Sequence, residues 1–367
     1  MMFKKTFIFV VFVVCLFGSG INVYANDNDD ELDDYIEIWS AEDLYNIRYN
    51  LDGNYKLMAD IDLSEATMVG GIYDFEERGW KPIGSDNSYQ GTAFTGVFDG
   101  QGYSIKGMRI SGFTMQSDGE LGLFSINNGT IKNLVIKDSI IDYSSKCNTY
   151  CGIVVGKNEG TISNIFIYNS EIKTKLWGKT IGNTCTYLSY IGGISGANYG
   201  SISSSYSEVF LDMKAYGYFN YLGHEYHYAK IMVSGISNNG NECAMIENCF
   251  SECSFAEQEE SFKDNGVYAQ TAYIKSGGIS IGEIGSVENC YSTSGLCDYG
   301  ISDGGTITSS YYIGKAKSQN TGSANNCYYF TGKGTADEGW IGLNDLQMKK
   351  QSFFEVFDFY NIWYMSE

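Results

Sequence analysis

Short apolar strands separated by polar, glycine-containing turns recur along most of this chain. In residues 151–172, two apolar runs flank the polar stretch 156–160, Gly-Lys-Asn-Glu-Gly. Glycine and asparagine accept positive φ at low cost, so this stretch predicts a turn between two strands. The apolar positions of the second run are Ile162, Ile165, Ile167 and Ile172. Strands this short cannot bury a face alone, so they must pack on other strands.

The same strand, turn and strand pattern is repeated, with an apolar marker residue in each copy. A Gly-Ile or Gly-Leu pair precedes most markers by six to ten residues, and the marker spacings run from 17 to 44 residues. The markers are Ile105, Ile131, Ile162, Ile202, Ile246, Val287, Ile307 and Ala324. A shortest unit of about 20 residues is typical of one coil of a solenoid. We therefore predict an all-β solenoid in which the strands of successive coils pair in parallel.

Three cysteines occupy one position of this repeat. Cys249, Cys290 and Cys327 align with Met108, Leu134 and Ile165, so the position is predicted to point inward. Free cysteine is among the most buried residue types, which favours a structural ladder. The alternative is a metal or redox ladder, but the chain has no Cys-x-x-Cys motif.

Both ends of a solenoid need a cover, because a bare end is an open sheet edge. Residues 40–51 predict an N-terminal helical cap, with Ser40 and Asp43 placed as in a capping box and Leu44, Ile47 and Leu51 on one face. Residues 55–63 then predict the first strand. The apolar segment 343–367 predicts a C-terminal cap.

The start of the chain is typical of a secreted protein. Two lysines precede an apolar run, and Val23-Tyr24-Ala25 is a small-x-small site, so residues 1–25 predict a secretory signal peptide. The alternatives to a signal peptide are a membrane anchor and a lipoprotein signal with a lipidated Cys15. Residues 26–34 hold six acidic residues and predict a solvated linker, which leaves 35–342 for the β-helix with its N-terminal cap. We expect a secreted or cell-surface protein without a membrane span in the mature chain.

The repeat resembles the GLUG-motif repeat family of bacterial secreted and surface proteins. The resemblance rests on residues 152–164 and their copies, on Asn-Cys-Tyr at 289–291 and 326–328, and on flanking pieces such as 96–105, Gly-Val-Phe-Asp-Gly-Gln-Gly-Tyr-Ser-Ile. It covers about residues 39–363. The resemblance implies a right-handed parallel β-helix, often used as the stalk of larger adhesins, and implies little about chemistry. Long insertions and the lack of a visible wall anchor depart from the stalk pattern.

Charge and residue content narrow the function. The chain carries 24 Lys and Arg against 44 Asp and Glu, a formal charge of −20, so nucleic acids and anionic membranes are unsuitable partners. A polysaccharide lyase on a β-helix needs a cationic base, and the chain's arginines are Arg48, Arg78 and Arg109. The alternating Asp60 and Asp62 favour structural carboxylates over a catalytic pair. We expect no cofactor and a binding or adhesion module in place of an enzyme. A carbohydrate-active enzyme and a purely structural spacer are the alternatives.

One histidine pair invites a metal interpretation. His224 and His227 lie at i and i+3 around Glu225, whereas zinc proteases place two histidines at i and i+4 on a helix. The surrounding residues lack a helical apolar period. We therefore predict a surface loop, with His224 and His227 as weak metal candidates.

Three consecutive repeats carry insertions that are rich in aromatic residues. The extra residues are 173–190, 212–231 and 256–275, and all three leave the coil at the same corner. Insertions on one face of a solenoid often form its binding face, and aromatic rings stack on sugars or anchor a protein partner. The alternative is that the rings cover apolar surface. The binding candidates, for a glycan or a host or extracellular protein, are Trp177, Tyr187, Tyr190, Tyr216, Tyr218, Tyr221, Tyr226 and Tyr228.

Overall fold

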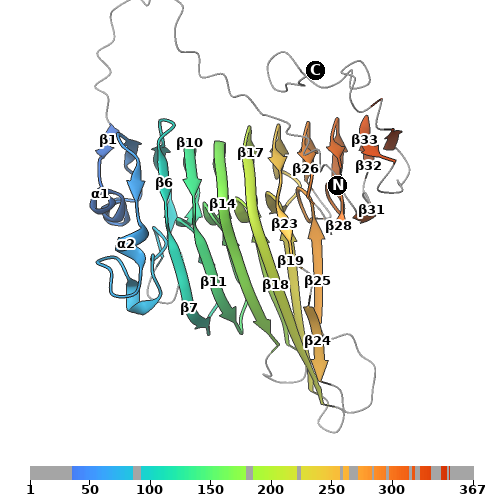
Figure 1. Cartoon of the computed structure of the whole chain (residues 1–367), viewed down its shortest axis with the longest axis horizontal. Coiled ribbons are helices and arrows are strands. Elements are labelled where there is room, and N and C mark those ends of the chain that lie inside the picture. Colours follow the sequence, from blue (N-terminus) through green and yellow to red (C-terminus); the bar gives the residue numbers. More distant parts are fainter. Residues whose placement is uncertain are drawn as a thin grey trace, which may run out of the picture.

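The chain folds into β-strands that run across the long axis of the molecule and are stacked one after another along it (Figure 1). Nearly all strand pairs are parallel and join equivalent strands of successive repeats, which confirms the predicted all-β, parallel and solenoid-like fold. The computed structural model describes residues 35–85, 92–178, 185–220, 225–256, 259–263, 272–282, 285–294, 297–313, 316–318, 323–331, 340–344 and 347. The predicted signal peptide and acidic linker lie outside these residues.

The strands form five stacks. The first contains β1 (Tyr35–Ile38), β2 (Asn54–Leu57), β5 (Val97–Asp99), the starts of β10 (Thr130–Lys137) and β14 (Thr161–Trp177), β17 (Ser201–Ser203), β21 (Met245–Glu247), β26 (Ser286–Glu288), β29 (Thr306–Thr308) and β32 (Ser323–Asn325). The second contains β3 (Ile61–Asp62), β6 (Ser104–Lys106), later parts of β10 and β14, β18 (Tyr206–Asn220), β22 (Phe250–Ser251), β27 (Tyr291–Ser292), β30 (Tyr311–Tyr312), β33 (Cys327–Phe330) and β34 (Trp340–Leu343).

The third stack contains β7 (Arg109–Met115), β11 (Ile140–Ser145), the ends of β14 and β18, β23 (Ser254–Phe255) and β24 (Glu259–Lys263). The fourth contains β8 (Gly119–Leu121), β12 (Thr149–Gly152), β15 (Cys185–Gly192), β19 (Glu225–Ser234), β25 (Ala272–Gly277), β28 (Cys297–Tyr299) and β31 (Ala316–Ser318). The fifth is a separate sheet of β4 (Ala93–Phe94), β9 (Phe124–Asn127), β13 (Val155–Asn158), β16 (Ser195–Asn198) and β20 (Ser237–Asn239).

Seven of the eight predicted markers are register partners in the first stack. Each marker from Ile131 to Ala324 pairs with the next one along the chain. Ile105 was assigned to the wrong strand, because it pairs with Ile136 and the true partner of Ile131 is Phe98. The misleading signal is local: Ser104-Ile105 copies the Ser-Ile of other repeats, although 97–99 already fills the marker strand.

The cysteine position points inward as predicted. Leu134, Ile165, Cys249, Cys290 and Cys327 are all fully buried. The prediction for Met108 is wrong. Because Ile105 pairs with Ile136 and not with Ile131, Met108 lies at the following corner of the coil, where its carbonyl accepts a hydrogen bond from Ile140 N at 2.8 Å.

A left-handed residue precedes the inward position in each of these repeats. Asn133, Asn164, Asn248, Asn289 and Asn326 have φ between 48° and 55°. Asparagine tolerates this region better than most residues because its short polar side chain bonds locally. The Asn-Cys and Asn-Ile pairs of the repeat therefore mark a corner followed by a core residue.

The predicted turn at 156–160 is shorter than expected. Gly156 and Asn158 belong to β13, and only residues 159–160 form the turn. Asn158 is fully buried and belongs to a ladder: its side chain accepts from Asn127 Nδ2 and donates to Asn198 Oδ1, both at 2.8 Å. A residue that looks like turn material is thus a core residue whose amide group is satisfied by its copies.

The N-terminal cap forms largely as predicted. Helix α1 (Ala41–Asn46) continues into the 3-10 helix η1 (Ile47–Tyr49), and Leu44 and Ile47 are buried. Ser40 Oγ accepts from Asp43 N at 3.2 Å, while the Asp43 carboxylate accepts from Trp39 N at 3.0 Å, one residue earlier than in a capping box.

The predicted first strand at 55–63 is wrong in two respects. β1 precedes the cap helix and pairs in parallel with β2, so the first strand lies before α1. The segment 55–63 is also not one continuous strand, because β2 ends at Leu57 and β3 begins at Ile61. Helix α2 (Ser64–Thr67) and the 3-10 helix η2 (Phe75–Glu77) follow. The predicted C-terminal cap, 343–367, lies almost entirely outside the described residues.

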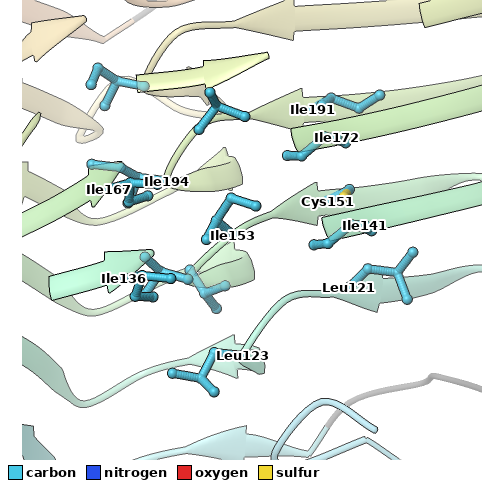
Figure 2. Close-up of a cluster of buried hydrophobic side chains, with 14 of the residues drawn as sticks. Leu121, Leu123, Ile136, Ile141, Cys151, Ile153, Ile167, Ile172, Ile191 and Ile194 are labelled. Carbon is cyan, nitrogen blue, oxygen red and sulfur yellow. The ribbon is translucent and has the colours of Figure 1, made fainter. Parts of the chain in front are cut away.

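The core runs through the middle of the stacks. Isoleucine and leucine side chains of successive repeats lie above one another, and Cys151 takes a position equivalent to Leu121 and Ile191 (Figure 2). The part of the chain that the structure describes contains no helix long and apolar enough to span a membrane.

Candidate functional site

The three aromatic insertions extend the strands of the coil beyond the rest of the stack. We define the arm as the described parts of these insertions: 173–177 and 185–190, 212–220 and 225–231, and 259–263 and 272–275. One layer of the arm pairs β14 with β18 and β18 with β24, and the other pairs β15 with β19 and β19 with β25. The arm projects past the ends of the neighbouring strands β7 and β11 (Figure 1). The insertions therefore lie side by side as expected, and their described parts are strands.

The middle insertion folds back on itself at the far end of the arm. Strands β18 and β19 form an antiparallel hairpin in which Tyr218 pairs with His227 and Phe219 with Tyr226. The surface loop predicted around the histidines is thus wrong from Glu225 onward. Tyr218, Tyr226, Tyr228 and His227 occupy strand positions, and their side chains lie outside the described part of the structure. Tyr221 and His224 also lie outside it.

Alternation along the strands separates an inner from an outer face of the arm. In β14, Thr174 and Leu176 are buried, whereas Lys175 and Trp177 between and beyond them are exposed. In β18, Met213 and Ala215 are buried on the same inner face. Side chains two residues apart on a strand share a face, so Trp177 and Tyr216 point outward together.

The outer face of the arm carries a stacked aromatic pair. The rings of Trp177 and Tyr216 lie 4.3 Å apart at 21° to each other, because the two residues are register partners. Trp177 nevertheless keeps 41% of its surface exposed. We call Trp177 and Tyr216 the arm pair.

Two of the other predicted tyrosines, Tyr187 and Tyr190, do not join the arm pair. Tyr187 points inward and packs against the core. Tyr190 lies on the outer face of the opposite layer, where its ring stacks on Tyr150 at 5.4 Å and 6°. Burial, with Tyr199 and Tyr190 nearby, raises the pKa of Tyr150 to about 12. The eight predicted residues therefore do not share one surface: Tyr187 covers core, and Tyr190 faces away from Trp177 and Tyr216.

Sequence reasoning missed two lysines beside the arm pair. Lys175 and Lys214 are register partners two residues before Trp177 and Tyr216, on the same outer face. Lys175 is exposed, and its partner on the preceding strand is Ser144. The signal was available, because Lys175-Leu176-Trp177 and Lys214-Ala215-Tyr216 share the order lysine, apolar residue, aromatic residue.

The row before the lysines is balanced in charge. Lys173 lies between Asp142 and Asp212 in register and bonds Glu171 at 2.8 Å. The hydrogen bond to Glu171, helped by the neighbouring carboxylates, raises the pKa of Lys173. Opposite charges therefore alternate in the row of Lys173, whereas Lys175 and Lys214 place two positive charges opposite each other.

A pair of glutamates lies on another part of the outer face. Tyr206 Oη donates to Glu252 Oε2 at 3.0 Å, and Glu208 lies two residues after Tyr206 on the same strand. Burial and the Glu252 charge raise the pKa of Glu208. The Tyr206 ring lies 5.2 Å from that of Tyr168, which is itself 38% exposed.

The cysteines have the environment of structural residues. Burial raises the pKa of Cys327 to about 11 and raises that of Cys290, and each thiol donates to a backbone carbonyl. A thiol that stays protonated is a poor nucleophile and a poor metal ligand. Within the described ranges, no group of three or more His, Cys, Asp or Glu side chains is placed to hold a metal ion.

Comparisons with known proteins leave the family open. No protein-family profile matches the chain, and no curated protein matches it. Among solved structures, the chain is similar to the crystal structure of an immunoglobulin A1 protease candidate from Bacteroides ovatus. The two chains share 19% sequence identity with a TM-score of 0.41, over 88% of this chain and 87% of the other. A similarity of this size says nothing about activity.

Proposed function

We propose that this protein is a secreted, right-handed parallel β-helix of the GLUG-motif type that binds glycans at the outer face of its arm. The parallel register of successive repeats supports the β-helix, and the repeated glycine and asparagine corners support the GLUG resemblance. Strands that supply the core are committed to packing, so binding belongs to the parts that leave the coil.

The exposed arm pair is the observation that carries this proposal. A tryptophan is usually well buried in a folded domain, but Trp177 is 41% exposed although it lies on a regular strand. Its position is held by the stacked Tyr216 ring and by the backbone pairing of β14 with β18, while the pairing with β11 on the other side ends one residue earlier, at Leu176. A rigid, exposed aromatic surface loses little conformational entropy when it stacks on a sugar ring.

A panel of immobilised oligosaccharides tests this proposal. The full-length secreted protein should bind members of the panel, and the double variant Trp177→Ala/Tyr216→Ala should lose that binding while keeping the unfolding midpoint of the wild type. Phe210→Ala is the matched control, because Phe210 is an aromatic residue of 37% exposure on the same outer face of β18. Equal binding by the double variant would remove the arm pair from the site. No binding to any member would favour a structural spacer.

An enzyme is the second candidate, and the glutamate pair favours it. Burial and the nearby Glu252 charge raise the pKa of Glu208, and a pair of carboxyl groups can serve as acid and base in glycoside hydrolysis. Soluble reducing ends released from the same oligosaccharides would support this candidate, provided that Glu208→Gln abolishes them. Intact oligosaccharides after prolonged incubation would exclude it for this panel.

A further inference from the structure

The lysine pair narrows the ligand that the arm can hold, an inference that rests on the proposed glycan binding. Lys175 and Lys214 are direct register partners, so their Cα atoms lie about 4.8 Å apart. Like charges directly opposite each other destabilise a sheet. The row before them avoids this cost by alternating Asp142, Lys173 and Asp212. The arm therefore places two lysines side by side in a protein whose formal charge is −20.

Lys175 is the side chain best placed to meet a ligand. It is exposed, its register neighbours are Ser144 and Lys214, and neither neighbour carries a negative charge. Lys214 differs, because its other register partner is Glu259 on β24. An ammonium group without a carboxylate in register is available for an anion from outside the protein.

The distance from Lys175 to the arm pair suits a small anionic ring. Residues two apart on a strand are separated by about 6.6 Å, and the flexible lysine side chain can cover that distance toward the Trp177 ring. A pyranose with one carboxylate offers an apolar ring face for Trp177 and an anionic group for Lys175. A long polyanion fits poorly, since the rest of the acidic surface would repel it.

We propose that the arm recognises a pyranose that carries a carboxylate, such as a uronic acid or a sialic acid at the end of a glycan. Trp177 and Tyr216 provide the stacking surface, and Lys175 binds the carboxylate. Lys173 takes no part, because Glu171 and the flanking aspartates already compensate its charge. The site distinguishes acidic from neutral sugars through Lys175 and binds both through the rings.

Matched pairs of glycans test this inference with the full-length secreted protein. Sialyllactose is compared with lactose, and a glucuronyl disaccharide with its glucosyl counterpart, by calorimetry at low and high salt. We expect the acidic member to bind about fivefold more tightly at low salt, the size of one partly exposed ion pair. High salt should shrink the difference, because exposed charges are screened.

Two lysine variants decide the role of Lys175. Lys175→Gln should abolish the preference, by lowering the affinity for the acidic member to that for the neutral member. Lys173→Gln, which removes the same charge two residues away, should keep the preference.

Several results would overturn the inference. Equal binding of acidic and neutral members, or a preference that survives Lys175→Gln, would overturn it and leave the proposed glycan binding standing. A preference for a sulfated lactose over sialyllactose would also overturn it, since the carboxylate would then not be the recognised group. If neither member of any pair binds, both this inference and the proposed function fail.

Discussion

The asparagine ladder of the coil body and the arm pair are built by the same parallel register but lie on opposite faces of the strands. In the body, Asn127, Asn158 and Asn198 face inward, and their side chains satisfy one another. In the arm, the stacked Trp177 and Tyr216 face outward and remain partly exposed. Stacking by itself is therefore not a sign of function. The face that a stack occupies decides whether its side chains fill the core or meet solvent.

The largest effect is expected from the core of the body. Ile162→Ala should lower the free energy of unfolding by about 2–5 kcal/mol, because it leaves a cavity between the buried Ile131 and Ile202. Urea unfolding followed by circular dichroism measures the change. A loss below about 1 kcal/mol would mean that the coil relaxes around the cavity and that the contrast with the arm is weaker than stated.

The asparagine ladder should be nearly as important. Asn158→Ala removes the bonds to Asn127 and Asn198 and two further bonds to the carbonyls of Gly160 and Ser201. We expect a loss of about 2–3 kcal/mol in urea unfolding, because the buried amide groups of Asn127 and Asn198 each lose one hydrogen-bond partner. Lys157→Ala is the control on the same strand, and it should change stability by less than half as much. Similar losses in the two variants would show that the ladder is not special.

Alkaline pH should weaken the body through its buried thiols. Burial raises the pKa of Cys297 to about 12, so the folded state keeps the thiol neutral while the unfolded chain ionises it from about pH 8.5 upward. The contribution is fully present below that pH, and stability falls as pH rises through the range, by about 1.4 kcal/mol per pH unit for this group.

Unfolding measured from pH 8 to 10.5 tests this contribution. Cys297→Ala should make the fall in stability shallower by close to one proton. An unchanged slope in the Cys297 variant would mean that this thiol does not report on folding.

The smallest effect on stability is expected from the arm pair. Trp177→Ala should change the free energy of unfolding by less than about 1 kcal/mol, because much of the side chain is already in water. The same variant is expected to lose glycan binding. A loss of stability comparable to that of Ile162→Ala would make Trp177 a packing residue and reverse its assignment.

The sequence predicted the stacking of the body because its repeats carry their own register. The apolar markers from Ile131 to Ala324 are register partners in successive strands, so their spacing in the sequence indicates which strands pair. The predictions are wrong where the local sequence pattern suggests one position for a residue and the strand pairing gives it another. Ile105 resembles a marker locally, and Asn158 resembles a turn residue, but pairing with Ile136 and the amide ladder decided their places. Long-range bonds of this kind are not visible in a short window of sequence.

The sequence predicted the position of the arm but not the strands that form it. Insertions at one corner of three consecutive repeats do lie side by side, but the apolar alternation of Thr174 and Leu176, and of Met213 and Ala215, makes them strands. That alternation also decides which aromatic residues face water, and it separates Tyr187 from Trp177. Counting tyrosines could not make this distinction, since it depends on which face of a strand each residue occupies.

The hairpin at the far end of the arm has a consequence for how the chain folds. Its register partners are 5 to 9 residues apart in sequence, whereas Ile162 and Ile202 are 40 residues apart. A short loop closes with little entropy loss, and isolated hairpins form in about 1–10 μs, while parallel pairing must wait for a whole coil to close. The β18–β19 hairpin can therefore form first and bring two strands of the same repeat together at its end. Parallel pairing of β18 and β19 with their neighbours can then extend from the hairpin toward the body. A segment that projects from the folded molecule is therefore well placed to start its folding.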